Sequence, residues 1–295
     1  MALLKVDFVS DWLQHLRERL REVWGDQVDP IKPEDLPSRF FDSFRRAIPP
    51  APRQLHCSDV FSIPPGHLPG WNFLARKVTN GEDLRPHLSK GHQQLTNQDG
   101  LLNDWGIHHF HLGLAPQQGK PHLITRTGPV ALAYVTNDAF YALGIYPHSP
   151  APWSRSELVE VIHRNWPNAI AQFRVAGISA SPVNEVQRTT LRAKHCSVFT
   201  ATLDGTIYAP LGGAVTGAGT DIQSVRQGDI WRTEIERLQA DCIRQAETFF
   251  CALESVGKSP LHELEGKLRF TPDGYAIEFP AHGVLVEINW EAVAE

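Results

Sequence analysis

Residues 103–113 read Asn-Asp-Trp-Gly-Ile-His-His-Phe-His-Leu-Gly, and three of these eleven residues are histidines. The alternation of this stretch predicts a β-strand over residues 106–114, in which successive side chains point to opposite faces. One face is expected to carry Trp105, Ile107, His109 and His111, and the other His108, Phe110 and Leu112. Two imidazoles on one strand face either line a site or place polar groups in a core, so the functional interpretation begins at His109 and His111.

Further elements are predicted downstream of the histidine strand. A hairpin is expected around Asn137-Asp138, because apolar runs cover residues 130–136 and 139–146. The pattern Ser154-x-x-Glu157 is typical of a capping box and predicts a helix that ends near Asn165. The remaining expected elements are a hairpin over 197–211 around Asp204-Gly205, a long helix over 222–253, and a β-meander over 267–289 with a turn at 272–274.

The N-terminal region is predicted to be helical. Apolar residues recur every three or four positions over residues 7–24, which is typical of an amphipathic helix. This stripe is expected in the core, and binding of a partner protein through it is the alternative. A second helix is predicted over residues 34–46. A proline-rich connector over 47–72 and a polar loop or lid over 76–102 are expected to follow.

These elements predict an α+β fold with N-terminal helices, a central antiparallel sheet, and a C-terminal long helix with a β-meander. Three consecutive regions are expected. They are a helical region with its connector (residues 1–75), a histidine-rich hairpin and helix (76–175), and an α+β region (176–295).

Composition excludes some classes of protein. The formal net charge is −5, which argues against a broad surface for nucleic acid. No apolar run approaches the ~18 residues of a membrane-spanning helix, and the start of the chain lacks the pattern of a signal peptide. The four cysteines are scattered and form no C-x-x-C motif. The sequence thus predicts a reduced, cytoplasmic protein that does not insert into membranes.

Clustered histidines near a cation suggest acid–base chemistry on a phosphate ester. Imidazole titrates near neutrality, so His109 or His111 is expected to act as the general base and His148 as the general acid. Arg126 is expected to stabilise the negative charge that grows on the phosphate, and Tyr141 to position the substrate.

A metal site is the alternative for the same residues. Cα atoms two residues apart on a strand are ~6.5–7 Å apart, which lets His109 and His111 reach one zinc or iron ion. A third ligand is expected from His148, His163 or a carboxylate such as Asp104. The sequence favours a site without a cofactor, because no carboxylate follows at the usual spacing. A third interpretation is that these are strand histidines bonded only to backbone and water.

Residues 106–150 resemble the last strands of RelE/ParE-type toxins. The segments that carry the resemblance are His109-Phe-His-Leu-Gly113 and the apolar hairpin from Val130 to His148. In that family such a hairpin ends with a histidine, which His148 matches, followed by an arginine and an aromatic residue. Here Ser149 replaces the arginine and the aromatic residue is Trp153. The resemblance implies a metal-free endoribonuclease built on a small curved sheet.

The expected function is therefore a nuclease-like phosphodiesterase, for example an RNA-cleaving toxin or defence effector. Its substrate is expected to be RNA or a small phosphate-containing molecule. Two alternatives stay open. One is a metal-dependent hydrolase or oxygenase with an H-x-H site. The other is a non-catalytic binding or assembly protein, for example one encoded by a phage or prophage, that docks through the helix over residues 7–24.

Overall fold

The computed structural model describes residues 3–149, 152–260 and 262–288. The chain forms two compact units. Residues 41–225 form the central unit, and residues 1–40 together with 226–295 form the terminal unit. The boundaries fall inside helices α2 (Leu36–Arg46) and α7 (Ile222–Arg244). This division differs from the three consecutive regions expected from sequence, because the two ends of the chain fold together.

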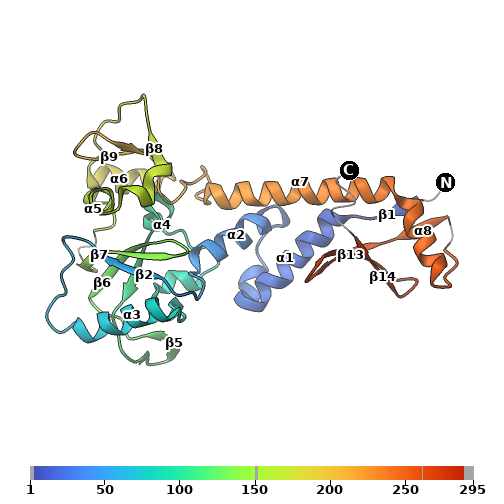
Figure 1. Ribbon diagram of the computed structural model, residues 1–295, viewed down its shortest axis with the longest axis horizontal. Coiled ribbons are helices and arrows are strands. Elements are labelled where there is room, and N and C mark those ends of the chain that lie inside the picture. The colour runs from blue at the N-terminus through green and yellow to red at the C-terminus, as the bar shows by residue number, and fades with distance from the viewer. Residues whose placement is uncertain (1–2, 150–151, 261, 289–295) are drawn as a thin grey trace. The chain divides into compact units, whose positions relative to one another are not determined.

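The terminal unit combines helices with a small antiparallel sheet (Figure 1). Its helices are α1 (Phe8–Trp24), η1 (Gly25–Val28), η2 (Pro33–Asp35), most of α7, and α8 (Ala246–Ser255). Its strands are β1 (Leu3–Lys5), β11 (Glu263–Glu265), β12 (Lys267–Thr271), β13 (Gly274–Phe279) and β14 (Val284–Ile288). Strands β12, β13 and β14 form the predicted meander, and β1 pairs in parallel with β11.

Helix α1 buries its apolar stripe inside the terminal unit. Phe8, Trp12, Leu16 and Leu20 repeat every four residues and are buried. The first three belong to a core that also contains Ile235 and Leu238 of α7. The stripe proposed for partner binding is therefore used by the protein's own core. The single helix expected over residues 222–253 is interrupted, since α7 ends at Arg244 and α8 begins at Ala246.

The central unit is built on a four-stranded sheet with the order β2-β7-β6-β3. Its strands are β2 (Gln54–Cys57), β3 (Ile107–His111), β6 (Pro129–Val135) and β7 (Ala139–Pro147). Strands β3, β6 and β7 are antiparallel, as expected from sequence, and β2 adds a parallel edge beside β7. The two smaller sheets contain β4 (Pro116–Gln117) with β5 (Lys120–Ile124), and β8 (Arg174–Val175) with β10 (Ile207–Tyr208) and β9 (Thr200–Ala201).

Helices cover both faces of this sheet (Figure 1). The helices of the central unit are α3 (Leu68–Asn80), η3 (Arg85–His87), η4 (Lys90–Gln93), α4 (Gly100–Trp105), α5 (Glu157–Asn165), η5 (Pro167–Phe173) and α6 (Glu185–Ala193). Two sequence expectations fail here. Helix α3 and the short helices after it occupy parts of the expected connector and loop. Ser154 does not cap α5, because its hydroxyl bonds to Thr189 and the N-cap residue is Ser156.

The alternation predicted for the histidine strand is confirmed by the packing on the two faces. Trp105 and Ile107 belong to the core beneath α5, together with Leu158 and Ile162. The alternate residues of the strand segment, Phe110 and Leu112, belong to the core beneath α3. We call these the α5 face and the α3 face of the sheet.

A bulge in β7 changes which of its residues point to each face. Leu132 pairs with Gly144, but the next residue, Ala133, pairs with Ala142, so β7 contains one extra residue. Before the bulge, Ala142 packs on the α3 face. After it, the even-numbered Tyr146 packs on the α5 face. An uninterrupted alternation would place residues 142 and 148 on the same face.

Among the residues that the structure describes, no helix combines the length and apolar character needed to cross a membrane. This finding agrees with the expectation from sequence that the chain has no such segment.

We predict that Trp12→Ala lowers the free energy of unfolding of the terminal unit by about 3–5 kcal/mol, since it removes a large buried side chain from the core. The matched control is Val23→Ala on the exposed side of the same helix, which should change stability by less than about 0.5 kcal/mol. Urea unfolding followed by circular dichroism measures both. Equal, small effects would show that the stripe of α1 is not part of the core.

Candidate functional site

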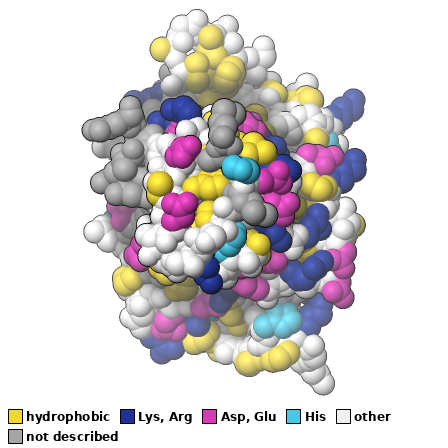
Figure 2. Space-filling view, turned by 90° about the vertical axis from the view of Figure 1, so that its right-hand side faces the viewer, with side chains coloured by type: hydrophobic (Ala, Val, Ile, Leu, Met, Phe, Trp, Pro, Cys, Tyr) yellow, Lys and Arg dark blue, Asp and Glu magenta, His cyan; other side chains and the backbone are white. Residues whose placement is uncertain are grey.

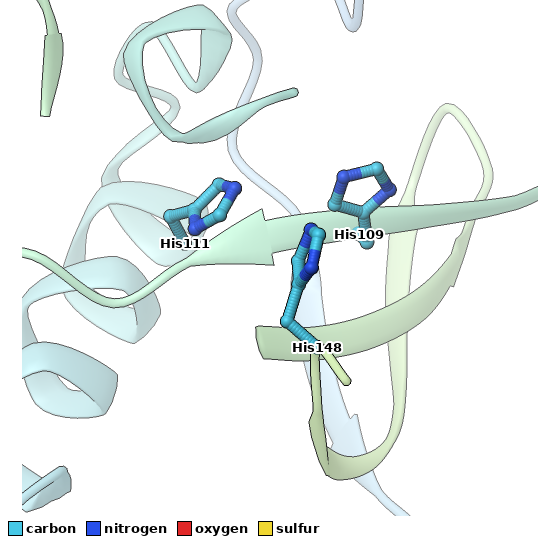
Figure 3. Close-up of side chains that lie close together, drawn as sticks. All are labelled: His109, His111 and His148. Atoms are coloured by element: carbon cyan, nitrogen blue, oxygen red, sulfur yellow. The ribbon is translucent and has the colours of Figure 1, made fainter. Parts of the chain in front are cut away.

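Three histidines of the central unit converge at the end of the sheet. His109 and His111 extend from β3, and His148 follows the last residue of β7 (Figure 3). One ring nitrogen from each residue lies within 4.8 Å of the other two. The ring centroids of His111 and His148 are 5.7 Å apart and nearly stacked, whereas that of His109 lies 5.9 Å from His111 and 6.0 Å from His148. In this arrangement the three imidazoles can bind the same ion or small molecule.

Backbone pairing brings the three residues together. His111 pairs with Val130 of β6, and Val130 pairs with Tyr146 of β7, so His148 lies at the same end of the sheet as His111. The backbone N–H of His148 donates to the carbonyl of Gly128 at 2.8 Å, which holds the chain just beyond the last strand pair. The bulge in β7 then turns the His148 side chain to the α5 face, where His109 and His111 point.

The cluster lines a cavity of about 400 Å³. Besides the three histidines, its walls contain Arg126, Lys90, Thr127, Ser89 and Gly128. None of these described residues is an aspartate or a glutamate, so the cavity has two cationic side chains and no carboxylate. This local charge is opposite in sign to the net charge of −5 of the whole chain.

Trp153 closes one side of the histidine cluster. Its ring centroid lies 5.1 Å from that of His109 and 5.6 Å from that of His148. The indole is half-buried, and its backbone carbonyl accepts a hydrogen bond from the guanidinium of Arg192. Aromatic packing of this kind limits the rotation of both imidazoles and removes part of their water.

Burial keeps the strand histidines neutral at pH 7. It lowers the pKa of His111 to about 3, helped by the positive charge of Arg126 and by the neighbouring imidazoles. Burial also lowers the pKa of His109, and the carboxylate of Asp99 opposes that shift. The ring of His111 is held by the backbone N–H of Thr127, which donates to Nδ1 at 3.3 Å.

Arg126 lies beside the histidines with most of its hydrogen-bonding capacity unused. Its Nη1 donates to the carbonyl of Leu88. Its Nε and Nη2 are buried and have no partner among the described residues. Burying two N–H groups without hydrogen-bond acceptors costs free energy of folding, and a bound anion would offset this cost best because it accepts charge-assisted hydrogen bonds.

A second, much smaller cavity shares His109 and Ser89 with the first. It has a volume of about 20 Å³, and its walls also include His108, His92, Arg46 and Asp99. Burial lowers the pKa of His108 to about 3, so it too is neutral at pH 7.

The structure does not bring all of the predicted site residues together. Tyr141 lies at the opposite end of β7 from His148, because it pairs with Tyr134, the partner of Ile107 at the start of β3. Its ring packs instead against His56 and Trp166, with centroids 5.3 and 4.9 Å away.

The two further metal ligands considered from sequence also lie elsewhere. His163 on α5 is bonded to the hydroxyl of Tyr208 at 2.8 Å and to the carboxylate of Asp204 at 3.1 Å. Asp104 is buried and accepts hydrogen bonds from Arg188 and Arg192. Of the residues named from sequence, the cluster therefore contains His109, His111 and His148, with Arg126 beside them.

The sequence analysis assigns no catalytic or metal-binding role to three residues at the site. Lys90 and Asp99 lie in the stretch expected to be a loop or lid, whose length was the available signal of function. Trp153 entered only as the late aromatic residue of the toxin resemblance. Each reaches the site through tertiary packing, which a single sequence does not reveal.

Likeness to known proteins adds nothing to this picture: no protein-family model, no curated protein and no solved structure matches the chain. The resemblance of residues 106–150 to RelE/ParE-type toxins stays an expectation from sequence.

The charges on the surface visible in Figure 2 are mixed. Lysine and arginine side chains are interspersed with aspartate and glutamate on that face, and the apolar side chains form small groups. That face presents no broad basic surface.

We predict that buried histidines make the central unit less stable as the pH falls below about 6.5. Burial lowers the pKa of His87 to about 4, so it is neutral when folded, whereas the unfolded residue takes up a proton below about pH 6.5. Its contribution to stability is complete above that pH and is lost as the pH falls toward 4. Between pH 6.5 and 5 the loss is about 1.5 kcal/mol for one such histidine.

The variant His87→Asn tests this expectation. Its amide can keep the hydrogen bond that Nδ1 of His87 makes to the carbonyl of His111, while the titrating ring is removed. The free energy of unfolding of the variant should fall less steeply between pH 6.5 and 5 than that of the wild type. The control is His122→Asn, an exposed histidine on β5. An unchanged slope in His87→Asn would contradict the assignment.

Proposed function

We propose that the protein is a metal-dependent hydrolase of phosphate esters and that His109, His111 and His148 hold the metal ion. The observation that carries this proposal is the approach of three imidazole nitrogens to within 4.8 Å of one another on one side of a cavity. Three protein ligands with one open position are the usual arrangement of a catalytic zinc site. Imidazole also suits iron, copper and nickel, so zinc is the first candidate among several ions.

The protonation state of the histidines supports a metal over acid–base catalysis. A general acid or base works best when its pKa lies near the working pH. Burial lowers the pKa of His111 to about 3, far from neutrality, and also lowers the pKa of His109. Neutral imidazole is the form that binds metal. Sequence alone favours a site without metal. The burial of the two strand histidines is the reason why we now favour a metal site.

The charge of the cavity supports an anionic substrate. Lys90 and Arg126 line it, none of its described wall residues is an aspartate or a glutamate, and a divalent ion would add two further positive charges. A phosphate ester can accept hydrogen bonds from the guanidinium of Arg126 and the ammonium of Lys90. A metal ion held by the histidines would polarise a phosphoryl oxygen of the ester and activate a water molecule. The residues of the chain would then orient the phosphate and stabilise its growing charge.

One observation favours a second candidate, a metal-free phosphodiesterase. The backbone N–H of Thr127 donates to Nδ1 of His111 at 3.3 Å, and while this contact is kept the proton of the neutral ring is on Nε2. Metal binding by His111 requires this long contact to break, so that one ring nitrogen has a free lone pair. An Nε2–H can donate to a phosphate oxygen without a metal. An RNA-cleaving toxin or defence effector of the kind implied by the sequence resemblance would use the site in this way.

Hydrolysis of a chromogenic phosphodiester, bis-p-nitrophenyl phosphate, separates the two candidates. We predict zinc-stimulated hydrolysis that a chelator abolishes, and a loss of at least ~100-fold in kcat/KM for His111→Ala. The matched control is His122→Ala, which should leave the rate unchanged. Activity that resists chelation would support the metal-free candidate. No hydrolysis of this substrate or of RNA, with or without metal, would contradict both.

Arg126 has a prediction of its own. Arg126→Gln should lower kcat/KM for the phosphodiester by about 10²–10³-fold and leave the metal content unchanged, because the guanidinium binds the anion and not the metal. The control is Arg164→Gln, an exposed arginine whose guanidinium pairs with Asp59. If Arg126→Gln hydrolyses the diester as fast as the wild type does, the phosphate assignment is wrong.

A further inference from the structure

We propose that Asp99 is the positioning residue of His109 and acts on the ring through a single water molecule in the small cavity between them. The inference rests on the metal site proposed above and deepens it. It concerns a residue that neither belongs to the three-histidine cluster nor lines its cavity.

His109 lines both cavities. One edge of its ring faces the larger cavity with His111 and His148, and the residue also lines the small cavity with Asp99. The two nitrogens of an imidazole lie on different edges of the ring, so one can bind a metal while the other donates a hydrogen bond. Within the described part of the chain, no protein group is hydrogen-bonded to either nitrogen of His109.

The size and lining of the small cavity suit one bridging water. Its volume of about 20 Å³ exceeds the ~10–15 Å³ that one water molecule requires and is too small for a larger ligand. Its walls offer polar groups from Ser89, Asn97 and Asp99, which can satisfy the hydrogen bonds of such a water.

Asp99 has one carboxylate oxygen for each of two tasks. Its Oδ1 accepts hydrogen bonds from the backbone N–H groups of Leu101 and Leu102 and so caps α4. Its Oδ2 has no hydrogen-bond partner among the described residues and is left for the cavity. The carboxylate also acts electrostatically on His109, since its charge opposes the effect of burial on that ring. A carboxylate behind a ligand histidine fixes the tautomer and orientation of the ring.

Two substitutions separate positioning from capping. Asparagine and serine are both good N-cap residues, so Asp99→Asn and Asp99→Ser preserve the cap of α4. Both remove the carboxylate charge that faces the small cavity. Affinity for Zn²⁺ is measured by competition with a chromogenic chelator, and the ligand geometry by the visible absorption of bound Co²⁺. The control is Asp7→Asn, which changes a capping aspartate of α1 in the terminal unit.

We expect both Asp99 variants to bind Zn²⁺ about 10–100-fold more weakly than the wild type and to show an altered Co²⁺ spectrum. Their thermal midpoints should stay close to that of the wild type, and Asp7→Asn should keep wild-type affinity. If both variants bind Zn²⁺ and Co²⁺ as the wild type does, Asp99 is only a helix cap and this inference is wrong, while the metal site stands. A wild-type protein that takes up neither ion overturns the metal site and this inference together.

Discussion

An extra residue in β7 decides which side chains can meet at the end of the central sheet. Strands β3 and β7 both approach this end, and strict alternation would send His148 to the α3 face, the opposite side from His109 and His111. The bulge between Ala142 and Gly144 shifts the alternation by one residue and turns His148 to the α5 face. The three-histidine cluster therefore depends on a local irregularity of the backbone, of the kind that often occurs next to functional sites.

Burial determines the protonation state of the two strand histidines in the cluster. In water three adjacent imidazoles would titrate near neutrality, but here the covered rings of His109 and His111 have lowered pKa values and stay neutral at pH 7. Arg126 strengthens this effect, since its positive charge disfavours a second positive charge on His111. Two nitrogens of the same guanidinium have no partner among the residues that the structure describes, and an anion would satisfy them. The net charge of the chain is negative, whereas the described walls of this cavity carry Lys90 and Arg126, and this contrast supports our proposal of an anionic substrate.

Sequence predicts the parts of this structure that depend on local periodicity. The alternation of the histidine strand, the hairpin around Asn137-Asp138, the C-terminal meander and the amphipathic helix α1 follow from the spacing of apolar residues, and the α+β fold is confirmed with them. Sequence does not predict helix α3, because the prolines of residues 47–72 favour a connector, whereas Pro69 lies in the first turn of α3, where proline is well tolerated. The bulge in β7 has no comparable signature. Sequence therefore proposes His148 for the site but does not predict the direction of its side chain. Sequence also assigns Tyr141 and His163 to this site, although the structure places both of them away from the three histidines.

X-ray absorption at the zinc K-edge of the Zn²⁺-loaded protein can show whether His109, His111 and His148 bind one metal ion. We expect about three imidazole nitrogens at ~2.0–2.1 Å from the zinc, together with one or two oxygen ligands. In a His109→Ala/His111→Ala double variant this imidazole signal should be lost. A wild-type spectrum dominated by water oxygens, without the multiple scattering typical of imidazole, would mean that the three histidines do not hold the ion.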